Sequence, residues 1–488
     1  MADDRKLTPR AVDFAAWYNE AVLSSELADY SPVRGSMVIR PWGYGIWERM
    51  QAALDRRFKD TGHENAYFPL LIPMSFIEKE KEHVEGFKPE LAVVTHAGGK
   101  ELEEPLVVRP TSETIIYSMY AKWVQSYRDL PVLMNQWANV MRWELRTRLF
   151  LRTAEFLWQE GHTAHATADE AEEETRLILR IYREVMEREL AMPPVTGLKS
   201  DSEKFAGAVR SYACEALMQD NRALQAGTSH FLGQNFSRQF DLKFQSEQGR
   251  EEYAWNTSWG VSTRLVGGMV MTHGDDEGIV VPPRLAPTQV VIVPIVKSSD
   301  AKASAIQHKA DELCGMLADQ HLRAKVDRRE HLSPGARFYE WERKGVPFRI
   351  ELGPKDLDKE QVVLVRRVLA ENGTRKEFLP QAHAVAMLPE RIDALQRELL
   401  ERANRRREEN SHRGVTEWEE MKEILKTRGG FVYTGWSGDP AVEQRAKEEM
   451  KATIRVIPDE KFRSHSPPER CIGGSGASRM EVVWARAY

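Results

Sequence analysis

The sequence predicts an α+β protein of several domains, with an antiparallel sheet first, then an α/β domain and a small α/β module. The chain has 488 residues, which favours two or three domains over one. Two β-type runs, 137–144 and 151–160, flank a charged loop, so they indicate an antiparallel hairpin. After a proline cluster at 282–287, strand-like and helical runs alternate, as they do in compact α/β domains.

The first part of the chain shows helical spacing in several places. Residues 11–30 carry one apolar stripe. The helical spacing at 46–59 ends shortly before Gly62, which is a candidate C-cap. Residues 168–190 are predicted to form a long charged helix. A helix also begins near Thr111, after a turn at Pro110. The run AYFPLLIP (66–73) is bounded by prolines and is predicted as a short buried or edge strand.

The second part of the chain alternates strands at 288–296, 323–328 and 362–368 with a helix at 300–320. Residues 389–410 carry opposite charges three or four apart, which indicates a solvated connecting helix. These patterns predict three domains: 1–283, 284–400, and a connector with a C-terminal module at 401–488.

Composition excludes several classes of protein. The chain is 42% apolar and 29% charged, which is typical of a folded protein. Its net charge of −5 does not indicate a strongly basic nucleic-acid binder, although one domain could still carry a basic patch. No apolar run reaches the ~18 residues of a membrane span. Three scattered cysteines and a polar N-terminus lead us to expect a cytoplasmic protein with reduced thiols that does not enter a membrane.

One face of the hairpin has an unusual composition. Alternation puts Arg152, Phe156, Trp158, Glu160 and His162 on one face of the second strand, and Arg142 and Glu144 on one face of the first. Arginine suits phosphate or carboxylate, and an aromatic ring can stack on a base, worth ~1–3 kcal/mol. The alternative is a solvated face with cross-strand ion pairs, each worth under about 1 kcal/mol.

Two further segments fit a ligand site. In RPTSETII, Thr111 or Ser112 is the expected helix N-cap and Glu113 lies in the first turn, where the helix dipole keeps a carboxylate ionised. Either this is a plain cap, or a hydroxyl and a carboxylate face a ligand amine. Arg264, in SWGVSTRLVGG, is a further candidate phosphate ligand or a structural arginine.

The usual nucleotide motifs are missing from the sequence. It contains no G-x-x-x-x-G-K-[ST] loop, and neither HIGH nor KMSKS. GGSGAS (473–478) has no lysine and fits a flexible turn better. If the chain binds ATP, arginines on a sheet would do so.

These segments resemble the motifs of class II aminoacyl-tRNA synthetases. GHENAYFPLL (62–71) is similar to the first motif, RWE (142–144) with RTAEF (152–156) to the second, and GVSTR (260–264) to the third. RPTSET, WQEGHTAH, HGDDEGIVVPPRLAP and VPFRIELGPKD are similar to segments of the prolyl-tRNA synthetase family. The likeness covers nearly the whole chain, and is closest to the archaeal- and eukaryotic-like form with a C-terminal extension.

The resemblance implies roles for matching residues. Arg142 and Arg264 would be the catalytic arginines. The implied ATP-binding residues are Arg142, Glu144, Arg152, Phe156, Gln225, Thr228 and Arg264. The implied proline-binding residues are Thr111, Glu113, Arg142, Trp158, Glu160, His162, Phe205 and His230. The implied tRNA anticodon contacts are Arg337, Glu340, Arg349 and Lys355, with surface charge as the alternative for each.

The resemblance also implies a homodimer that joins L-proline to tRNA(Pro) with ATP and Mg²⁺. Helix and pocket segments fill the stretch between His162 and Val261, so we expect no editing domain in cis, and we expect some activation of cysteine and alanine. Relatives often bind zinc in the C-terminal extension through four cysteines. This chain keeps only Cys471 there, with Ser437 in place of a second, so we expect no zinc and no other metal held by the protein alone. The terminal Tyr488 would either dock on the catalytic domain or fray.

Two alternatives remain at this stage. A sister class II enzyme for threonine, serine, glycine or histidine would share the three motifs. A degenerate paralogue acting only as a binding subunit would have lost the arginines that Arg142, Arg152 and Arg264 represent.

Overall fold

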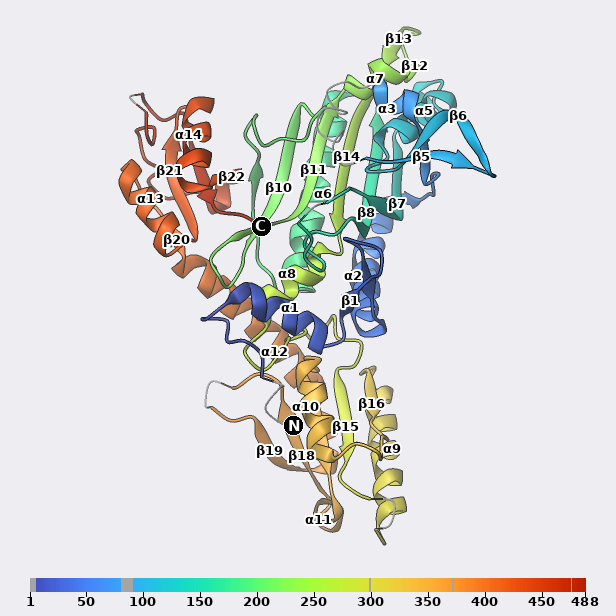
Figure 1. Cartoon of the computed structure of the whole chain (residues 1–488), viewed down its shortest axis with the longest axis vertical. Coiled ribbons are helices and arrows are strands. Elements are labelled where there is room, and N and C mark those ends of the chain that lie inside the picture. The colour runs from blue at the N-terminus through green and yellow to red at the C-terminus, as the bar shows by residue number, and fades with distance from the viewer. Residues whose placement is uncertain (1–5, 80–90, 145, 298–299, 371–372, 475) are drawn as a thin grey trace.

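The computed structural model describes residues 6–79, 91–144, 146–297, 300–370, 373–474 and 476–488. One large antiparallel sheet dominates one end of the long axis, and a smaller sheet lies at the other (Figure 1). A long helix, α12 (Gln381–Glu409), starts beside the smaller sheet and leads to the C-terminal elements. The chain therefore returns to the large sheet after leaving it.

The large sheet has eleven strands in the order β20-β21-β23-β22-β9-β10-β11-β14-β8-β7-β3. Its central strands are antiparallel neighbours. Their bounds are β3 (Glu64–Asn65), β7 (Val132–Met141), β8 (Glu155–His165), β9 (Val195–Leu198), β10 (Arg210–Leu217), β11 (Ala223–Gly233) and β14 (Trp255–Ser262).

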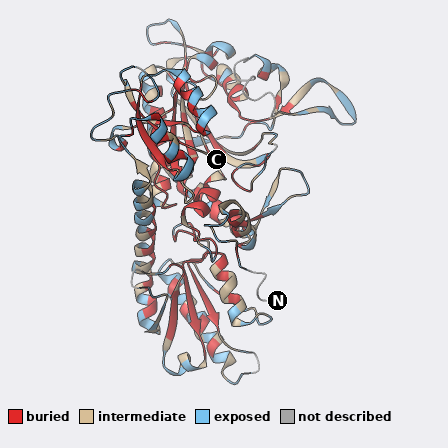
Figure 2. Ribbon diagram, turned by 60° about the vertical axis from the view of Figure 1, so that its left-hand side comes forward, coloured by how far each residue is buried: buried red, intermediate tan, exposed pale blue. Residues whose placement is uncertain are grey.

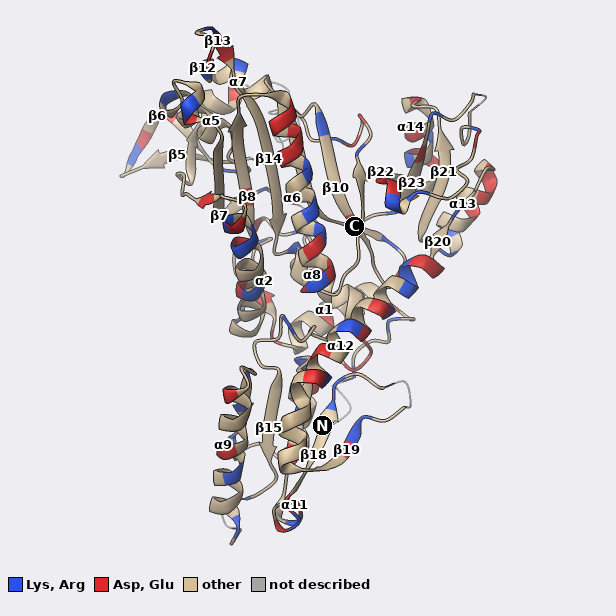
Figure 3. Ribbon diagram, turned by 180° about the vertical axis from the view of Figure 1, so that it is seen from behind, with Lys and Arg blue, Asp and Glu red and all other residues tan. Residues whose placement is uncertain are grey.

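Helices cover one face of this sheet. α6 (Ala168–Arg188) packs across β8, β10, β11 and β14, with its charged side chains on the outside (Figure 3). α1 (Phe14–Ser24), α2 (Pro41–Asp60) and α8 (Arg264–His273) complete the same apolar core, in which Trp17, Trp47 and Trp259 are fully or nearly fully buried. α5 (Glu113–Trp123) and α7 (Asn235–Phe240) pack together at one end of the sheet. Three short elements, β4 (Leu71–Pro73), α3 (Met74–Glu78) and the hairpin β5 (Ala92–Ala97) with β6 (Lys100–Val108), extend that end.

The smaller sheet has the order β16-β15-β17-β18-β19. Its first three strands are parallel and its last two antiparallel, and its central strands are almost wholly buried (Figure 2). The elements are β15 (Val290–Pro294), α9 (Ala303–Asp319), β16 (Ala324–Val326), α10 (Pro334–Arg343), β17 (Phe348–Leu352), α11 (Pro354–Asp358), β18 (Gln361–Arg366) and β19 (Lys376–Pro380).

The C-terminal elements join the large sheet through β22, which pairs antiparallel with β9 at Ile457↔Leu198 and Pro458↔Gly197. The two strands approach so closely that a Cβ on Gly197 would lie 2.1 Å from the Ile457 carbonyl oxygen. Phe431, Trp436, Ile454 and Trp484, the residues expected to hold this module, are all buried. The elements are β20 (Ser411–His412), α13 (Trp418–Thr427), β21 (Phe431–Trp436), α14 (Pro440–Met450), β22 (Thr453–Pro458) and β23 (Met480–Ala485).

The predicted helices at 168–190 and 300–320 and the strands at 288–296 and 362–368 are confirmed, with slightly different ends. Most of the predicted strand at 66–73 is wrong, because only Leu71–Pro73 pair with β6. The helix expected from 389 begins eight residues earlier, at Gln381, and runs through Pro389. Smaller hairpins are β1 (Ala28–Tyr30) with β2 (Met37–Ile39), and β12 (Lys243–Gln245) with β13 (Glu251–Tyr253). Among the described residues, no helix has both the length and the apolar character that crossing a membrane requires.

Candidate active site

The open face of the large sheet carries two adjoining cavities of about 240 and 250 Å³. The strand register explains which side chains meet there, because residues on the same face of paired strands lie side by side. Strands β11, β14 and β8 lie side by side (Figure 1). The pairs are Trp158 with Ser262, Glu160 with Gly260, His162 with Ser258, Thr228 with Gly260, and His230 with Ser258. Alternation along β8 is therefore confirmed for Phe156, Trp158, Glu160 and His162, all of which line the first cavity.

Glu160 is a buried carboxylate of the first cavity with several hydrogen-bond donors around it. It is 2% exposed and accepts hydrogen bonds from Ser112 Oγ at 2.5 Å, Ser112 N at 3.1 Å and Gln136 Nε2 at 2.8 Å. His162 Nε2 lies 3.0 Å from the same carboxylate. Ser112 is the N-cap of α5, but its hydroxyl does not cap the helix. The Ser112 side chain therefore holds Glu160 in place instead of capping α5.

Thr111 and Glu113 lie beside this carboxylate at the start of α5. Both are buried, and the Thr111 hydroxyl donates a short hydrogen bond to Glu113. Glu113 occupies the first helical position, where the helix dipole stabilises a negative charge. The pair offers oxygen acceptors to a cationic ligand, as the sequence led us to expect.

Two histidines in the cavity differ in protonation behaviour. Burial lowers the pKa of His162, but the Glu160 hydrogen bond and the charges of Glu113 and Glu160 outweigh it, so that the pKa is raised overall. Burial lowers the pKa of His230 to about 4. His230 bonds Ser211 Oγ through Nδ1 at 2.8 Å and stacks on Phe205, with ring centroids 4.7 Å apart. His230 is thus a neutral ring that forms an apolar wall with Phe205.

Arginines gather at the other end. The Arg142 guanidinium carbon lies 5.5 Å from the Phe156 ring centroid and 5.4 Å from that of Trp158. Burial, with repulsion from Arg152 and Arg142, lowers the pKa of Arg264 to about 10. Three guanidiniums held together in this way form a site for a polyanion, and guanidinium pairs well with phosphate.

The second cavity extends this arginine end. It is lined by Arg142, Glu144, Arg152, Phe156 and Arg264, and a 3.5 Å ion pair joins Arg152 to Glu144. Gln225 and Thr228 line the first cavity, so every implied ATP residue borders one of the two cavities.

The sequence prediction was wrong about how three of these residues are held. β7 ends at Met141 and β8 begins at Glu155, so Arg142, Glu144 and Arg152 lie outside the strands. Pairing continues by one bond, Arg142 N to Ala154 O at 2.8 Å, and the chain then turns through Phe150, which has a φ of +62°. The loop, rather than alternation, brings these side chains to the cavity.

Lys199 and Ser211, which line the first cavity, were not predicted from the sequence, and Ser112 was expected only as a possible helix N-cap. Each acts through a partner, since Ser112 holds Glu160, Ser211 holds His230 and Lys199 pairs with Glu215 at 3.2 Å. Only Ser112 carried a signal, because it stands between two residues that were chosen.

The implied anticodon residues fall into two groups. Arg337 and Arg349 are 3% and 6% exposed; Arg337 donates to the carbonyls of Asp327 and Pro294, and Arg349 pairs with Glu351. Glu340 is partly exposed and held by Arg329 and Lys344, and Lys355 is exposed. Both arginines are buried and bond within the fold, whereas Glu340 and Lys355 reach the surface.

The C-terminal module carries Cys471, whose Sγ lies 3.2 Å from Ser437 Oγ. In the part of the chain that the structure describes, no three His, Cys, Asp or Glu side chains are grouped so as to hold a metal ion. Tyr488 docks on the large sheet: its hydroxyl bonds Asp220 Oδ2 at 2.5 Å, and Arg222 lies over its ring.

Comparison with known proteins agrees with this geometry. Family models match residues 93–273 (tRNA synthetase class II core domain (G, H, P, S and T)), 289–391 (anticodon binding domain) and 418–488 (prolyl-tRNA synthetase, C-terminal). The proline--tRNA ligase of Chlorobium phaeovibrioides is 54% identical over the full length of both chains, and that of Roseiflexus castenholzii is 53% identical over 99% of each.

A solved structure gives the same result. The crystal structure of prolyl-tRNA synthetase from Cryptosporidium parvum, complexed with halofuginone and AMPPNP, matches with a TM-score of 0.93 and 37% identity over all of both chains. The predicted α+β fold class is confirmed. The chain belongs to the prolyl-tRNA synthetase family of class II aminoacyl-tRNA synthetases.

Proposed function

We propose that the chain activates L-proline with ATP and transfers the prolyl group to tRNA(Pro), with the two adjoining cavities as its active site. The observation that carries this proposal is the division of one continuous site into an arginine end and an end with carboxylates and a neutral aromatic wall. The Cryptosporidium parvum relative was crystallised with AMPPNP, which supports a nucleotide at the arginine end. Formation of prolyl-tRNA(Pro) by the purified chain tests the proposal.

In the first step a proline carboxylate oxygen bonds to the α-phosphorus of ATP, and pyrophosphate leaves. Arg142 holds the α-phosphate and the proline carboxylate, while Arg152 and Arg264 hold the outer phosphates. The guanidiniums are already in place where negative charge is redistributed in the transition state. They therefore stabilise this charge without a rearrangement of the site. Phe156 stacks on adenine, and Glu144 accepts a hydrogen bond from the adenine amino group. Gln225 and Thr228 also contact the nucleoside.

Thr111 and Glu113 accept hydrogen bonds from the secondary ammonium of proline, and Phe205 with His230 covers the ring. Trp158, Glu160 and His162 form the floor. In the second step the 3′-terminal adenosine of the tRNA attacks the adenylate carbonyl, and AMP leaves. Both reactants are bound side by side, so no covalent enzyme intermediate is needed.

Mg²⁺ fits as an ion that arrives with ATP. Only one carboxylate, Glu144, lines the described part of the arginine cavity, whereas Mg²⁺ is commonly held by one or two carboxylates and substrate phosphates. It would neutralise phosphate charge there and would be held mainly by the phosphates themselves.

We also propose the finer properties of this enzyme. A lost methylene changes binding by only about 1–3 kcal/mol, so cysteine and alanine are activated weakly. Along the sequence, the segment between β8 and β14 includes α6, β9, β10 and β11, which belong to the large sheet and its helix layer. This supports the absence of an editing domain in cis. Efficient hydrolysis of alanyl-tRNA(Pro) by the purified chain would overturn that last point.

The proposed enzyme is a cytoplasmic, zinc-free homodimer with domains at 1–283, 284–400 and 401–488. Exposed Tyr67 (71%) and Leu70 (36%) near the β3 edge of the sheet support a dimer interface. The hydrogen bond between Cys471 and Ser437 supports a module without zinc. Sedimentation velocity and elemental analysis test these two properties, and a monomer or one zinc per chain would contradict them.

We propose that Lys355 and Glu340 contact the tRNA anticodon, and that Arg337 and Arg349 support the surface beneath. Lys355 is exposed, which suits contact with phosphate or guanine. Lys355→Ala is expected to raise the KM for tRNA(Pro) and leave proline activation unchanged.

A further inference from the structure

A third cavity, of about 220 Å³, lies where the end of α8, the N-terminal segment, the smaller sheet and α12 meet. Its walls include Arg10, Arg402 and Arg406, together with His273 and Asp275. This volume is below the range of ~300–1,000 Å³ typical of drug-sized ligands, so it suits a small ligand. The cavity is separate from the active site, because the residues lining it do not line the other two.

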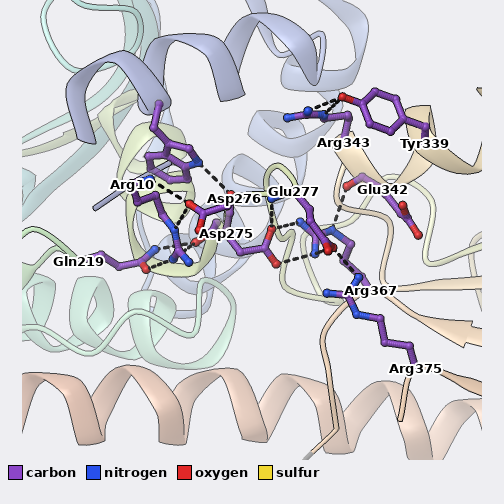
Figure 4. Close-up of polar contacts among 12 residues, drawn as sticks. Arg10, Gln219, Asp275, Asp276, Glu277, Tyr339, Glu342, Arg343, Arg367 and Arg375 are labelled. Carbon is purple, nitrogen blue, oxygen red and sulfur yellow. Dashed lines mark hydrogen bonds and ion pairs between the residues drawn. The ribbon is translucent and has the colours of Figure 1, made fainter. Parts of the chain in front are cut away.

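Polar contacts fix most of these walls (Figure 4). Arg10 bonds Asp276, Gln219 and the Gly274 carbonyl at 3.0, 2.5 and 2.8 Å. Asp275 accepts two hydrogen bonds from the buried Arg367, at 2.7 and 2.5 Å. The single lining carboxylate is thus neutralised, and it faces a cation of the smaller sheet.

Arg406 differs from its neighbours. Arg10 pairs with Asp276 and Arg402 with Glu398, but within the described residues the Arg406 guanidinium has no ion pair, and its buried Nε has no hydrogen-bond partner. Burial, with repulsion from Arg10, lowers its pKa to about 10, and no carboxylate opposes this. At neutral pH Arg406 is therefore a charged guanidinium in a cavity wall without a counter-ion from the protein.

The remaining titratable side chain of these walls, His273, does not supply the missing charge. His273 bonds the Leu190 carbonyl through Nε2 at 2.8 Å, and burial lowers its pKa to about 3, so it stays neutral. A partly buried charge without a counter-ion is unfavourable, and a bound anion reduces this cost.

We propose that this junction cavity binds a small phosphate-type anion through Arg406, with Arg10 and Arg402 at its sides. A planar guanidinium pairs with phosphate through two parallel N–H donors. The phosphate is free phosphate or pyrophosphate, or a single backbone phosphate of bound tRNA. Its occupation links the N-terminal segment to α12, because Arg10 and Arg406 belong to these two elements.

Titration calorimetry with inorganic phosphate and with pyrophosphate tests the site, using Arg406→Gln and the matched control Arg405→Gln. Arg405 is exposed on the same helix, so both variants lose one charge. Arg406→Gln is expected to lose one binding event or to weaken it at least tenfold, whereas Arg405→Gln binds like the wild type. Arg406→Lys keeps the charge but loses the two parallel N–H donors of the guanidinium. Its phosphate affinity is expected to lie between the affinities of these two variants.

A second arm measures tRNA affinity against salt for the same proteins. If the ligand is a backbone phosphate, Arg406→Gln alone weakens tRNA binding and lowers the salt slope by about one. If Arg406→Gln matches Arg405→Gln in both arms, the proposal is overturned. Equal melting temperatures of the two variants show that a lost signal is not lost folding.

Discussion

The guanidinium of Arg455 donates two hydrogen bonds to the carboxylate of Glu215, at 3.0 and 2.9 Å, across the junction of the C-terminal module and the large sheet. Lys199 Nζ contacts the same carboxylate at 3.2 Å and also lines the first cavity. Burial raises the pKa of Glu215, but the charges of Arg455 and Lys199 outweigh this and lower it overall. The C-terminal module therefore supports one wall of the first cavity.

Arg455→Met is expected to destabilise the protein by about 3–5 kcal/mol, because it leaves Glu215 buried with one cation fewer. The KM for proline is expected to rise, since Lys199 loses a fixed partner. Chemical denaturation and ATP–pyrophosphate exchange measure the two effects. Arg445→Met removes an exposed pair with Glu449 and is expected to have a much smaller effect, because solvent screens this pair. Equal effects of the two substitutions would refute this role.

Glu160→Gln is expected to lower kcat/KM for proline at least about tenfold. The amide is similar in size, but its NH₂ group can no longer accept from Ser112 or Gln136, and a lost hydrogen bond to a charged group costs about 1.5–3 kcal/mol. Glu155→Gln, at an exposed position of the same strand, is the control. Exchange kinetics at varied proline concentration would contradict the account if both variants behaved alike.

Gly161→Ala is expected to destabilise the fold by about 1–3 kcal/mol or more through overpacking. A Cβ at this position would lie 2.1 Å from the Trp259 ring, which is buried under the sheet. Gly315→Ala is expected to act in the opposite direction, because Gly315 lies inside α9 with open space around it, and alanine favours helix by about 0.5–1 kcal/mol. Thermal melting of the two variants decides; a harmless Gly161→Ala would be inconsistent with this packing.

Stability is expected to fall as the pH drops from about 6.5 to 4. Burial lowers the pKa of His165 to about 4, that of His230 to about 4 and that of His273 to about 3. In this range the unfolded chain binds protons that the folded chain refuses, so the free energy of unfolding rises with pH. Each of these histidines is expected to lower the free energy of unfolding by on the order of 3 kcal/mol between pH 6.5 and pH 4. Denaturation at stepped pH checks this, and His230→Gln is expected to flatten the dependence.

The sequence predicted the central elements well where periodicity was long or alternation strict. α6 is an example of the first, because burial on one side selects apolar residues, and the cavity face of β8 is an example of the second. It failed where geometry comes from a loop, as for Arg142 and Arg152, and where a helix continues through a proline, as at Pro389. Lys199 and Glu215 could not be predicted, and neither could the hydrogen bond of Ser112 to Glu160, because these roles depend on contacts between residues far apart in sequence.

ATP–pyrophosphate exchange, measured with each amino acid in turn on the wild type and Arg142→Ala, tests the central claim most directly. The account predicts strong exchange with proline, weak exchange with cysteine and alanine, and none with threonine. It predicts that Arg142→Ala abolishes proline-dependent exchange, because the α-phosphate and the proline carboxylate lose a shared ligand. Exchange that followed threonine instead of proline, or that survived in Arg142→Ala, would contradict it.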